Sequence, residues 1–556
     1  MTVRLTLLIA GCAAALLAGS AKKSQDLEGV APGQAVQVIV QYRNQPSQAD
    51  VDHLAAKGGK IKWSHPSVRG ISLTIPAASL DDVAADPNVT YVSVDRPLRS
   101  TMDYTVPTTG ADLALSYGYD GNGVTVAVLD SGIAHHADLG GGSKDGSRVV
   151  YSESFLPGAK GKGTNDLYGH GTHVAGIVAG NGSVSGGALR GIAPKARLVD
   201  LQVLDENGVG TDSAVIQALE RAIELKDVYG IRIVNLSLGR PIVESYTRDP
   251  LCQAVEAAWK AGLTVVVAAG NSGRSGLPGS GGYWTITAPG NDPYVITVGA
   301  MKTMTTPARG DDLVASYSSK GPSPIDQVVK PDLVAPGNRV KSLLSDKDST
   351  LADMFPGNIV KASKGNGIGN AQYMELSGTS MAAAVVSGAS ALLLERDPQL
   401  TPDQIKTLLM KTSTKSFPAV SYATDETTGQ VYRSQYDIFT IGAGYLDILS
   451  ALSDGTHASG PALSLSAVYD RSGAVAMVAS PSSAWVQTYQ AWLTPVWGPS
   501  VLVPGSSSAA WGSSAAWGSS AAWGSSAAWG SSAAWGSSAA WGSSAAWGSS
   551  VLLGEK

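Results

Sequence analysis

An α/β fold built on a mostly parallel sheet is the architecture that the central part of this 556-residue chain predicts. Between residues 110 and 452, short apolar runs of strand length alternate with longer helical patterns. Such alternation is typical of a parallel sheet with helices on both faces, and active groups in such sheets collect at the carboxyl ends of the strands. The segments that carry this prediction are Val124–Leu129, Ala196–Val203, Ser213–Leu225, Ile231–Leu236, Leu251–Ala261 and Leu263–Ala268.

The most informative segment runs from Glu375 to Glu395. The small residues Ser377-Gly-Thr-Ser380 open an Ala/Val/Leu-rich run with no charge before Glu395, which predicts a helix that is buried on every side. A hydroxyl in its first turn faces unpaired N–H groups and the positive end of the helix dipole, which would stabilise an oxyanion on a substrate bonded to Ser380. Taken alone, such a cluster more often marks an ordinary N-cap.

Three other segments supply partners for that serine. A β-branched run ends in Asp130, at the predicted carboxyl end of a buried strand. His170 stands at a glycine-flanked helix start, and a second apolar strand ends in Gly270-Asn271, whose amide could donate to an oxyanion. Asp, His and Ser in this chain order form a recognised arrangement of the serine-protease triad.

Five motifs in the same order give the chain a close resemblance to the subtilisin-like serine peptidases (subtilases). The resemblance implies that Asp130 orients His170, that His170 is the general base, that Ser380 is the nucleophile, and that Asn271 and the Ser380 N–H form the oxyanion hole. His170 and His173 do not suggest zinc, since no third ligand lies at a known spacing. The motifs are Asp130-Ser-Gly132, His170-Gly-Thr-His-Val-Ala-Gly176, Asn235-Leu-Ser-Leu-Gly239, Ala268-Ala-Gly-Asn271 and Gly378-Thr-Ser-Met-Ala-Ala383.

The same resemblance assigns substrate contacts. Ser237, Leu238 and Gly239 match the segment that pairs with an extended peptide by strand addition. Thr287 matches a position beside the primary specificity pocket where several bacterial subtilisins have glycine, so a shallower pocket is expected. Asp332-Leu-Val-Ala-Pro-Gly337 also matches a family segment.

Two positions differ from what the family pattern would lead one to expect. Ala384 stands where the family usually has proline, which could loosen the support of the nucleophile. Asp138 matches a calcium ligand of the family, but the partner loop 180–189 is longer and rich in Gly and Ser. No cofactor is required for catalysis in this reading, and a structural calcium ion remains compatible with the sequence.

Composition bears on the possible binding partners and on the role of the cysteines. The net charge of −5 argues against nucleic-acid binding. Of the two cysteines, Cys12 lies in the leader and Cys252 in a predicted helix, where a packed and inert thiol is expected.

The N-terminal region predicts a leader and a separate small domain. Residues 1–21 resemble a secretory signal peptide, and a lipoprotein-type modification at Cys12 is the alternative. Residues 22–101 read as a small α+β unit that resembles the inhibitory propeptide domain of subtilases, with cleavage expected between about Leu98 and Tyr104. A permanent N-terminal domain is the alternative.

The catalytic domain is expected to span residues 102–455, followed by a β-rich or linker segment at 456–506 and a short C-terminal tail at 549–556. Between these lie seven identical copies of Ser-Ser-Ala-Ala-Trp-Gly, at residues 507–548, which contain seven of the 13 tryptophans. An even period places every Trp on one face of an extended chain, so a small solenoid or pairing with another chain is one reading and a flexible tail is the other.

The sequence therefore predicts a secreted serine endopeptidase, extracellular or in the cell envelope, made as a self-processing precursor. Its partners would be protein or peptide substrates and its own propeptide as intramolecular inhibitor, with association with the cell surface or with itself through the repeats left open. Two alternatives remain: a catalytically impaired subtilase fold that acts as a binding module, and a surface structural protein whose Trp repeat is the functional part.

Overall fold

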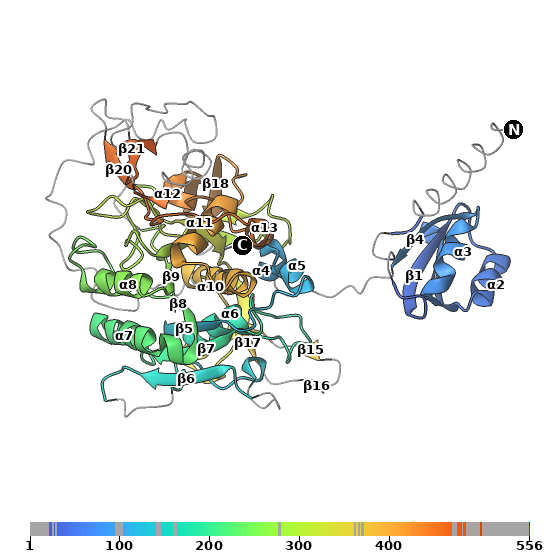
Figure 1. Cartoon of the computed structure of the whole chain (residues 1–556), viewed down its shortest axis with the longest axis horizontal. Coiled ribbons are helices and arrows are strands. Elements are labelled where there is room, and N and C mark those ends of the chain that lie inside the picture. The colour runs from blue at the N-terminus through green and yellow to red at the C-terminus, as the bar shows by residue number, and fades with distance from the viewer. Residues whose placement is uncertain are drawn as a thin grey trace. The chain divides into compact units, whose positions relative to one another are not determined.

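The chain divides into two compact units, residues 1–100 and 101–556, in a computed structural model (Figure 1). The predicted leader (1–21), most of the predicted cleavage region and the Trp repeats lie outside the described residues, so those predictions stay untested. The structure describes residues 22–24, 27, 30–94, 104–140, 146–158, 164–275, 280–360, 363–364, 367–368, 372–425, 428–469, 475–480, 482–484, 501–502 and 555.

The first unit is a four-stranded antiparallel sheet with two helices. The strands lie in the order β2-β3-β1-β4, and residues such as Val38, Leu54 and Leu73 form its own apolar core. The unit combines helices and strands, as the predicted small α+β unit requires. They are β1 (Ala35–Tyr42), α2 (Gln48–Ala56), β2 (Lys60–His65), β3 (Gly70–Pro76), α3 (Leu80–Ala85) and β4 (Val89–Val94).

The second unit is organised around an eight-stranded sheet, in which every neighbouring pair is parallel except β10 and β11. The order is β11-β10-β9-β8-β5-β7-β6, with β12 beside β10. The predicted mostly parallel α/β sheet is thus confirmed. Its strands are β5 (Thr125–Asp130), β6 (Val149–Ser154), β7 (Arg197–Gln202), β8 (Ile231–Leu236), β9 (Thr264–Ala268), β10 (Ile296–Lys302), β11 (Leu313–Val314) and β12 (Leu333–Pro336).

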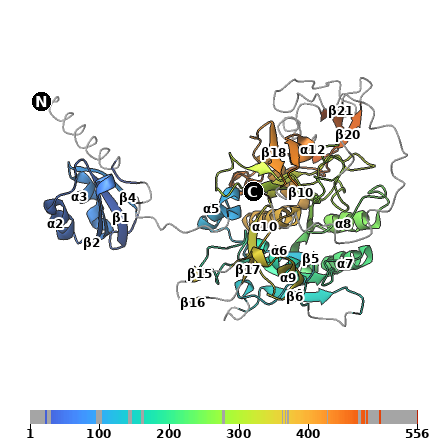
Figure 2. The same cartoon turned by 180° about the vertical axis from the view of Figure 1, so that it is seen from behind.

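Two pairs of helices cover this sheet, which gives the three layers seen in Figures 1 and 2. Helices α7 (Asp212–Tyr229) and α8 (Pro250–Lys260) pack together on one face, and α6 (His170–Ala179) packs against α10 (Thr379–Arg396) on the other. Every residue of α10 from 379 to 394 is buried, as its uncharged sequence predicted. Ala384 lies within this uninterrupted helix, so its departure from the family pattern leaves no visible break.

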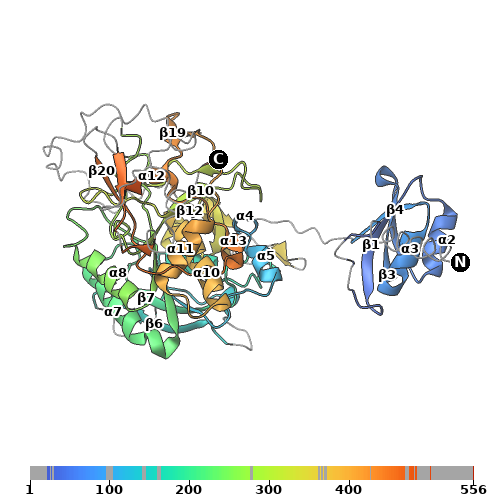
Figure 3. The same ribbon diagram turned by 45° about the horizontal axis from the view of Figure 1, so that its top comes forward.

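Smaller elements complete the second unit (Figure 3). The predicted β-rich segment after residue 455 contains β20 and β21, which pair with each other. Among the described helices, none combines the length and the apolar character that a membrane crossing requires. The remaining helices and strands are α4 (Thr105–Thr109), α5 (Ala111–Ser116), β13 (Val340–Leu343), α9 (Thr350–Met354), β14 (Ile359–Val360), β15 (Ser363–Lys364), β16 (Gly367–Ile368), β17 (Tyr373–Leu376), α11 (Pro402–Thr412), β18 (Val420–Thr424), β19 (Val431–Gln435), α12 (Ile438–Ile441), α13 (Ile448–Ser453), β20 (Ser466–Tyr469), β21 (Val475–Val478) and β22 (Val501–Leu502).

Candidate active site

The acid and the imidazole of the predicted triad are in direct contact. Asp130 is the last residue of the fully buried strand β5, and only 1% of its surface is exposed. Its Oδ1 lies 2.7 Å from Nδ1 of His170, the first residue of α6. Because Nδ1 faces a carboxylate, the proton of the neutral ring sits on Nδ1 and leaves Nε2 as the acceptor, which is the tautomer that a general base requires.

A close approach of two backbones brings these side chains together. Gly169 caps α6 with a φ of 102°, a conformation that favours glycine. A Cβ atom on Gly171 would lie 2.2 Å from the carbonyl oxygen of Gly132. Only a glycine therefore allows the first turn of α6 to pack against the residues that follow β5.

Asp166 organises the same turn, and sequence reasoning did not single it out. Its carboxylate accepts hydrogen bonds from the backbone N–H groups of Gly169 (2.7 Å) and Thr172 (2.8 Å), and from the hydroxyl of Ser131 (2.8 Å). Ser131 Oγ in turn accepts from the N–H of Gly171. An acid four residues before a predicted helix start is an N-terminal signal that could have revealed this role.

The electrostatics of the site favour the charged form of His170. Burial is the largest single influence and lowers the pKa of the ring, but the charge and hydrogen bond of Asp130, with the charge of Asp166, outweigh it. The pKa of His170 is therefore raised above the ordinary histidine value of about 6.5. The contact with Asp130 thus stabilises the imidazolium that forms when the ring takes a proton.

Ser380 is the second residue of α10, whose N-terminus points into the site. Its Oγ donates to the carbonyl oxygen of Ser237 at 3.2 Å, and its own carbonyl accepts from the Ser237 hydroxyl at 2.9 Å. Within the described residues the Ser380 hydroxyl makes no hydrogen bond to His170, so the structure completes the Asp–His half of the triad and leaves the Ser–His hydrogen bond unmade. Catalytic hydrogen bonds are often long or misaligned before a substrate is bound.

Asn271 faces the nucleophile turn from the loop that follows β9. Its Oδ1 accepts from the backbone N–H of Thr379 (2.9 Å) and from the hydroxyl of Thr379 (3.1 Å). Since a backbone N–H can only donate, these contacts fix the amide orientation. Nδ2 is then the remaining, donating atom of this side chain, as an oxyanion hole requires.

The predicted substrate-binding segment lies beside the nucleophile. Ser237 follows β8, and its hydroxyl accepts from the side-chain amide of Asn235 at 2.9 Å while it donates to the Ser380 carbonyl. The Ser237 side chain therefore supports the nucleophile turn. Leu238 and Gly239 continue the segment, and Arg240 pairs with Ala288 as an isolated antiparallel bridge.

Thr287 occupies the space between two glycines of the neighbouring segments. A Cβ atom on Gly239 would lie 2.6 Å from Thr287 Oγ1, and one on Gly270 would lie 2.9 Å from its Cγ2. The threonine hydroxyl donates to the Ala269 carbonyl at 3.3 Å, and the following Ala288–Pro289 bond is cis. The side chain thus fills the volume where a glycine would leave a deeper hollow.

The predicted calcium ligand Asp138 is engaged by protein donors. Its Oδ1 accepts from the Ser183 hydroxyl and the Val184 N–H, both at 2.8 Å, and its Oδ2 accepts from the hydroxyl of Tyr373. The partly buried guanidinium of Arg148 donates to the backbone carbonyl oxygen of Asp138. Hydroxyl and amide hydrogens already engage both oxygens of this carboxylate, so the residues present do not fit a calcium ion here.

His173 and Cys252 are packed side chains. Nε2 of His173 lies 3.0 Å from the Met374 carbonyl oxygen and 3.2 Å from that of Val340, and burial lowers the pKa of its ring to about 3. Cys252 is fully buried, and burial raises the pKa of its thiol. Neither side chain is available for chemistry at the surface.

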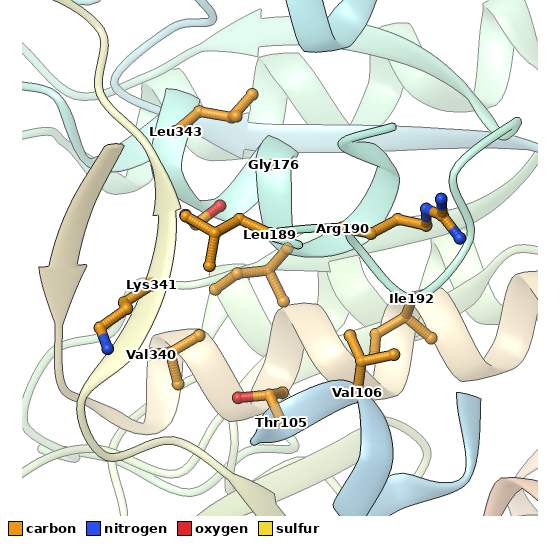
Figure 4. Close-up of a pocket in the computed structure, with 11 residues that line it drawn as sticks. Thr105, Val106, Gly176, Leu189, Arg190, Ile192, Val340, Lys341 and Leu343 are labelled. Atoms are coloured by element: carbon orange, nitrogen blue, oxygen red, sulfur yellow. The ribbon is translucent and has the colours of Figure 1, made fainter. Parts of the chain in front are cut away.

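The small cavity in Figure 4 is separate from this site. It lies between α4, α6 and β13, and its wall includes Gly176, Leu189 and Leu343. None of the four candidate catalytic residues, all of which the structure describes, lines it. The cavity therefore adds nothing to the site.

Comparison with known proteins decides the family. Residues 121–433, more than half of the chain, match the model of the subtilase family. The chain belongs to this family. It is a subtilisin-like serine endopeptidase, as its five motifs predicted.

Bacterial serine proteases match more than half of the chain. The chain is similar to serine protease AprX of Bacillus subtilis, with 36% identity over 361 residues, 64% of this chain and 76% of the relative. It is also similar to subtilisin DY of Bacillus licheniformis, with 34% identity over 315 residues, 56% of this chain and 92% of the relative. The solved structure of sphericase is 28% identical, covers 59% of this chain and 92% of its own, and gives a TM-score of 0.44.

Proposed function

We propose that this subtilase is a secreted endopeptidase that processes its own precursor, with Asp130, His170 and Ser380 as its triad. The observation that carries the proposal is the 2.7 Å contact between Asp130, at the carboxyl end of β5, and His170, on the helix α6 that packs against α10. A buried carboxylate paired with a histidine of raised pKa is the arrangement that activates a serine hydroxyl.

In the proposed reaction, the Ser380 hydroxyl attacks the substrate carbonyl carbon while Nε2 of His170 takes its proton. Asp130 holds Nδ1–H and stabilises the imidazolium. The negative charge on the carbonyl oxygen is met by Nδ2 of Asn271 and by the N–H of Ser380 at the positive end of α10. His170 then returns the proton to the leaving amine, and water hydrolyses the acyl-enzyme by the reverse sequence.

Substrate recognition is proposed to use the backbone of Ser237, Leu238 and Gly239 for strand addition. Thr287 would limit the depth of the pocket for the side chain before the cleaved bond, so small and medium side chains should be preferred. Thr287→Gly should raise kcat/KM for a peptide with phenylalanine at this position by about tenfold relative to one with alanine. An unchanged ratio would remove Thr287 from the pocket wall.

The N-terminal unit, residues 22–101, is proposed as the propeptide of this enzyme. It has a core and a sheet of its own, which suits a domain that assists folding and is then removed. The leader at residues 1–21 is proposed to direct secretion.

Expression of the wild type beside Ser380→Ala tests both self-processing and the nucleophile. N-terminal sequencing of the purified proteins should show loss of the first ~100 residues in the wild type only. Equal processing of both proteins would mean that another protease removes this unit. A processed Ser380→Ala protein with undiminished peptidase activity would refute the assignment of the nucleophile itself.

A further inference from the structure

Glu555, the penultimate residue, lies in a charged recess of the second unit. The residues that surround it are distant from it in the sequence. Only 7% of Glu555 is exposed. Its Oε1 lies 2.7 Å from Nη2 of Arg274, and its Oε2 lies 3.1 Å from Nζ of Lys302. Oε1 also accepts from the backbone N–H of Ser316 at 3.0 Å and from the Ser316 hydroxyl. One side chain is thus held by two cations and by two neutral donors.

The recess also binds the backbone of this residue. The side-chain amide of Asn338 donates to the Glu555 carbonyl oxygen at 2.8 Å, and the Glu555 N–H donates to Asn338 Oδ1 at 2.9 Å. Paired contacts of this kind fix the position and the direction of the backbone at this residue. We name Arg274, Lys302, Ser316 and Asn338 the carboxylate recess.

Charge complementarity favours a carboxylate at this place. Lys302 is 3% exposed, and the side chain of Arg274 is 14% exposed. The Arg274 guanidinium also pairs with Asp425 and lies over the ring of Tyr432. Burial raises the pKa of Glu555, but Lys302, Ser316 and Arg274 outweigh burial and lower it below its ordinary value. Charges withdrawn from water are stabilised by opposite charge, and the Glu555 carboxylate supplies it to Arg274 and Lys302 together.

The carboxylate recess adjoins the loops that support the active site. Arg274 follows Asn271 by three residues, and the N–H of Gly273 donates to the Tyr317 carbonyl at 2.8 Å. The Tyr317 hydroxyl donates to the carbonyl oxygen of Gly337 at 3.0 Å, and the same oxygen accepts from the N–H of Gly378 at 2.8 Å. A ligand on Ser316 and Asn338 therefore restrains segments that lead directly to the oxyanion donor and to the nucleophile turn.

We propose that the carboxylate recess is a receptor for Glu555 of the same chain. Strand β22 (Val501–Leu502), which pairs with β21, and Glu555 are then held by the same unit on either side of the Ser-Ser-Ala-Ala-Trp-Gly copies in the sequence. The ligand class is a glutamate that offers its carboxylate together with its backbone N–H and carbonyl. Docking braces the loops that carry Asn271 and Gly378.

Amide hydrogen exchange on the full chain tests the proposal. The variants carry Ser380→Ala to prevent autolysis, and docking is read without any activity measurement. Removal of residues 555–556 takes away the acceptor of the Ser316 N–H, so peptides covering residues 314–317 and 337–339 should exchange at least tenfold faster. Glu555→Gln, which keeps the shape and loses the charge, should accelerate the same peptides and covers the case in which the deletion does not fold.

The control is Glu220→Gln, the same change at an exposed glutamate on α7, which should leave both peptides unchanged. Unaltered exchange in the deletion and in Glu555→Gln would overturn the proposal. Light scattering, which measures the molar mass in solution, shows which copy of the chain supplies Glu555. A monomer, with and without residues 555–556, supports docking within one chain. A wild-type dimer that separates when residues 555–556 are removed would place the glutamate of a second copy in the recess and overturn the proposal as stated.

Discussion

Replacing Asn271 by aspartate separates the structural and catalytic contributions of this side chain. Oδ1 of Asn271 accepts two hydrogen bonds from Thr379, at 2.9 and 3.1 Å. Aspartate has the same shape and keeps both, so the fold and the nucleophile turn should be preserved. The change replaces the donor Nδ2 by a charged oxygen on the side where the oxyanion forms.

The expected rise of the activation free energy is the sum of two contributions. Loss of one oxyanion donor costs roughly 2.7–4 kcal/mol, a value measured on a protease of the same family. Repulsion between two unit charges about 4 Å apart adds about 1 kcal/mol in water and about 4 kcal/mol at the surface of a protein. Asn271 is partly exposed, so the sum lies at about 4–8 kcal/mol, and kcat should fall by about 10³–10⁶.

The measurement is kcat and KM on a chromogenic peptide, beside the melting temperature of each protein. The N-terminal unit is removed with a metalloprotease, which is then inhibited, because a slow variant cannot be expected to process itself. Asn271→Ala should lose only about 10²–10³ in kcat, since it removes the donor without adding charge. An aspartate variant as active as the alanine variant, at an unchanged melting temperature, would refute the assigned orientation of the amide.

Three further outcomes are expected. Because the pKa of His170 is raised and only the neutral ring accepts a proton, kcat/KM should fall as pH drops through a midpoint above about 6.5. Asp130→Asn should lower that midpoint and reduce kcat by about 10⁴. An unshifted midpoint in this variant would contradict the pairing of Asp130 with His170. Gly171→Ala, whose Cβ would lie 2.2 Å from a carbonyl oxygen, should lower kcat at least tenfold, whereas Gly310→Ala, with nothing within 4 Å, should match the wild type. A chelator should leave the melting temperature unchanged, because protein donors occupy Asp138; a decrease that disappears in Asp138→Asn would show an ion bound there.

The framework of the site could be predicted because it is encoded locally. Asp130 ends an unbroken apolar run, and Ser380 opens an uncharged one, so strand end and helix start are visible in the sequence. His170 stands between glycines that permit close packing, and the structure places such a contact at Gly171. In each case neighbouring residues determine the position of the functional side chain.

What sequence reasoning missed depends on contacts between distant segments. Loop 180–189 is recognisable in the sequence as the partner of Asp138, and Ser183 and Val184 of this loop do donate to it. The third donor, Tyr373, is 235 residues away and has no signal in the sequence. Glu555 lies 281 residues from Arg274. No local pattern indicates which partners a lone carboxylate will meet, since this is decided by the packing of the whole unit.

The Ser380 hydroxyl must leave its hydrogen bond to Ser237 before it can react, and the geometry of that bond shows how much this costs. Its hydrogen bond to the Ser237 carbonyl, at 3.2 Å, is longer than the 2.5–3.0 Å range of O–H···O bonds and is therefore weak. Breaking such a bond costs about 1 kcal/mol at most, or about fivefold in rate. Nucleophilic attack in the related enzymes draws on far larger contributions from the base and the oxyanion hole. Rotation of the hydroxyl toward His170 thus costs little, whereas the Asp130–His170 contact and the Asn271 orientation, which are far harder to rebuild, are already in place before a substrate arrives.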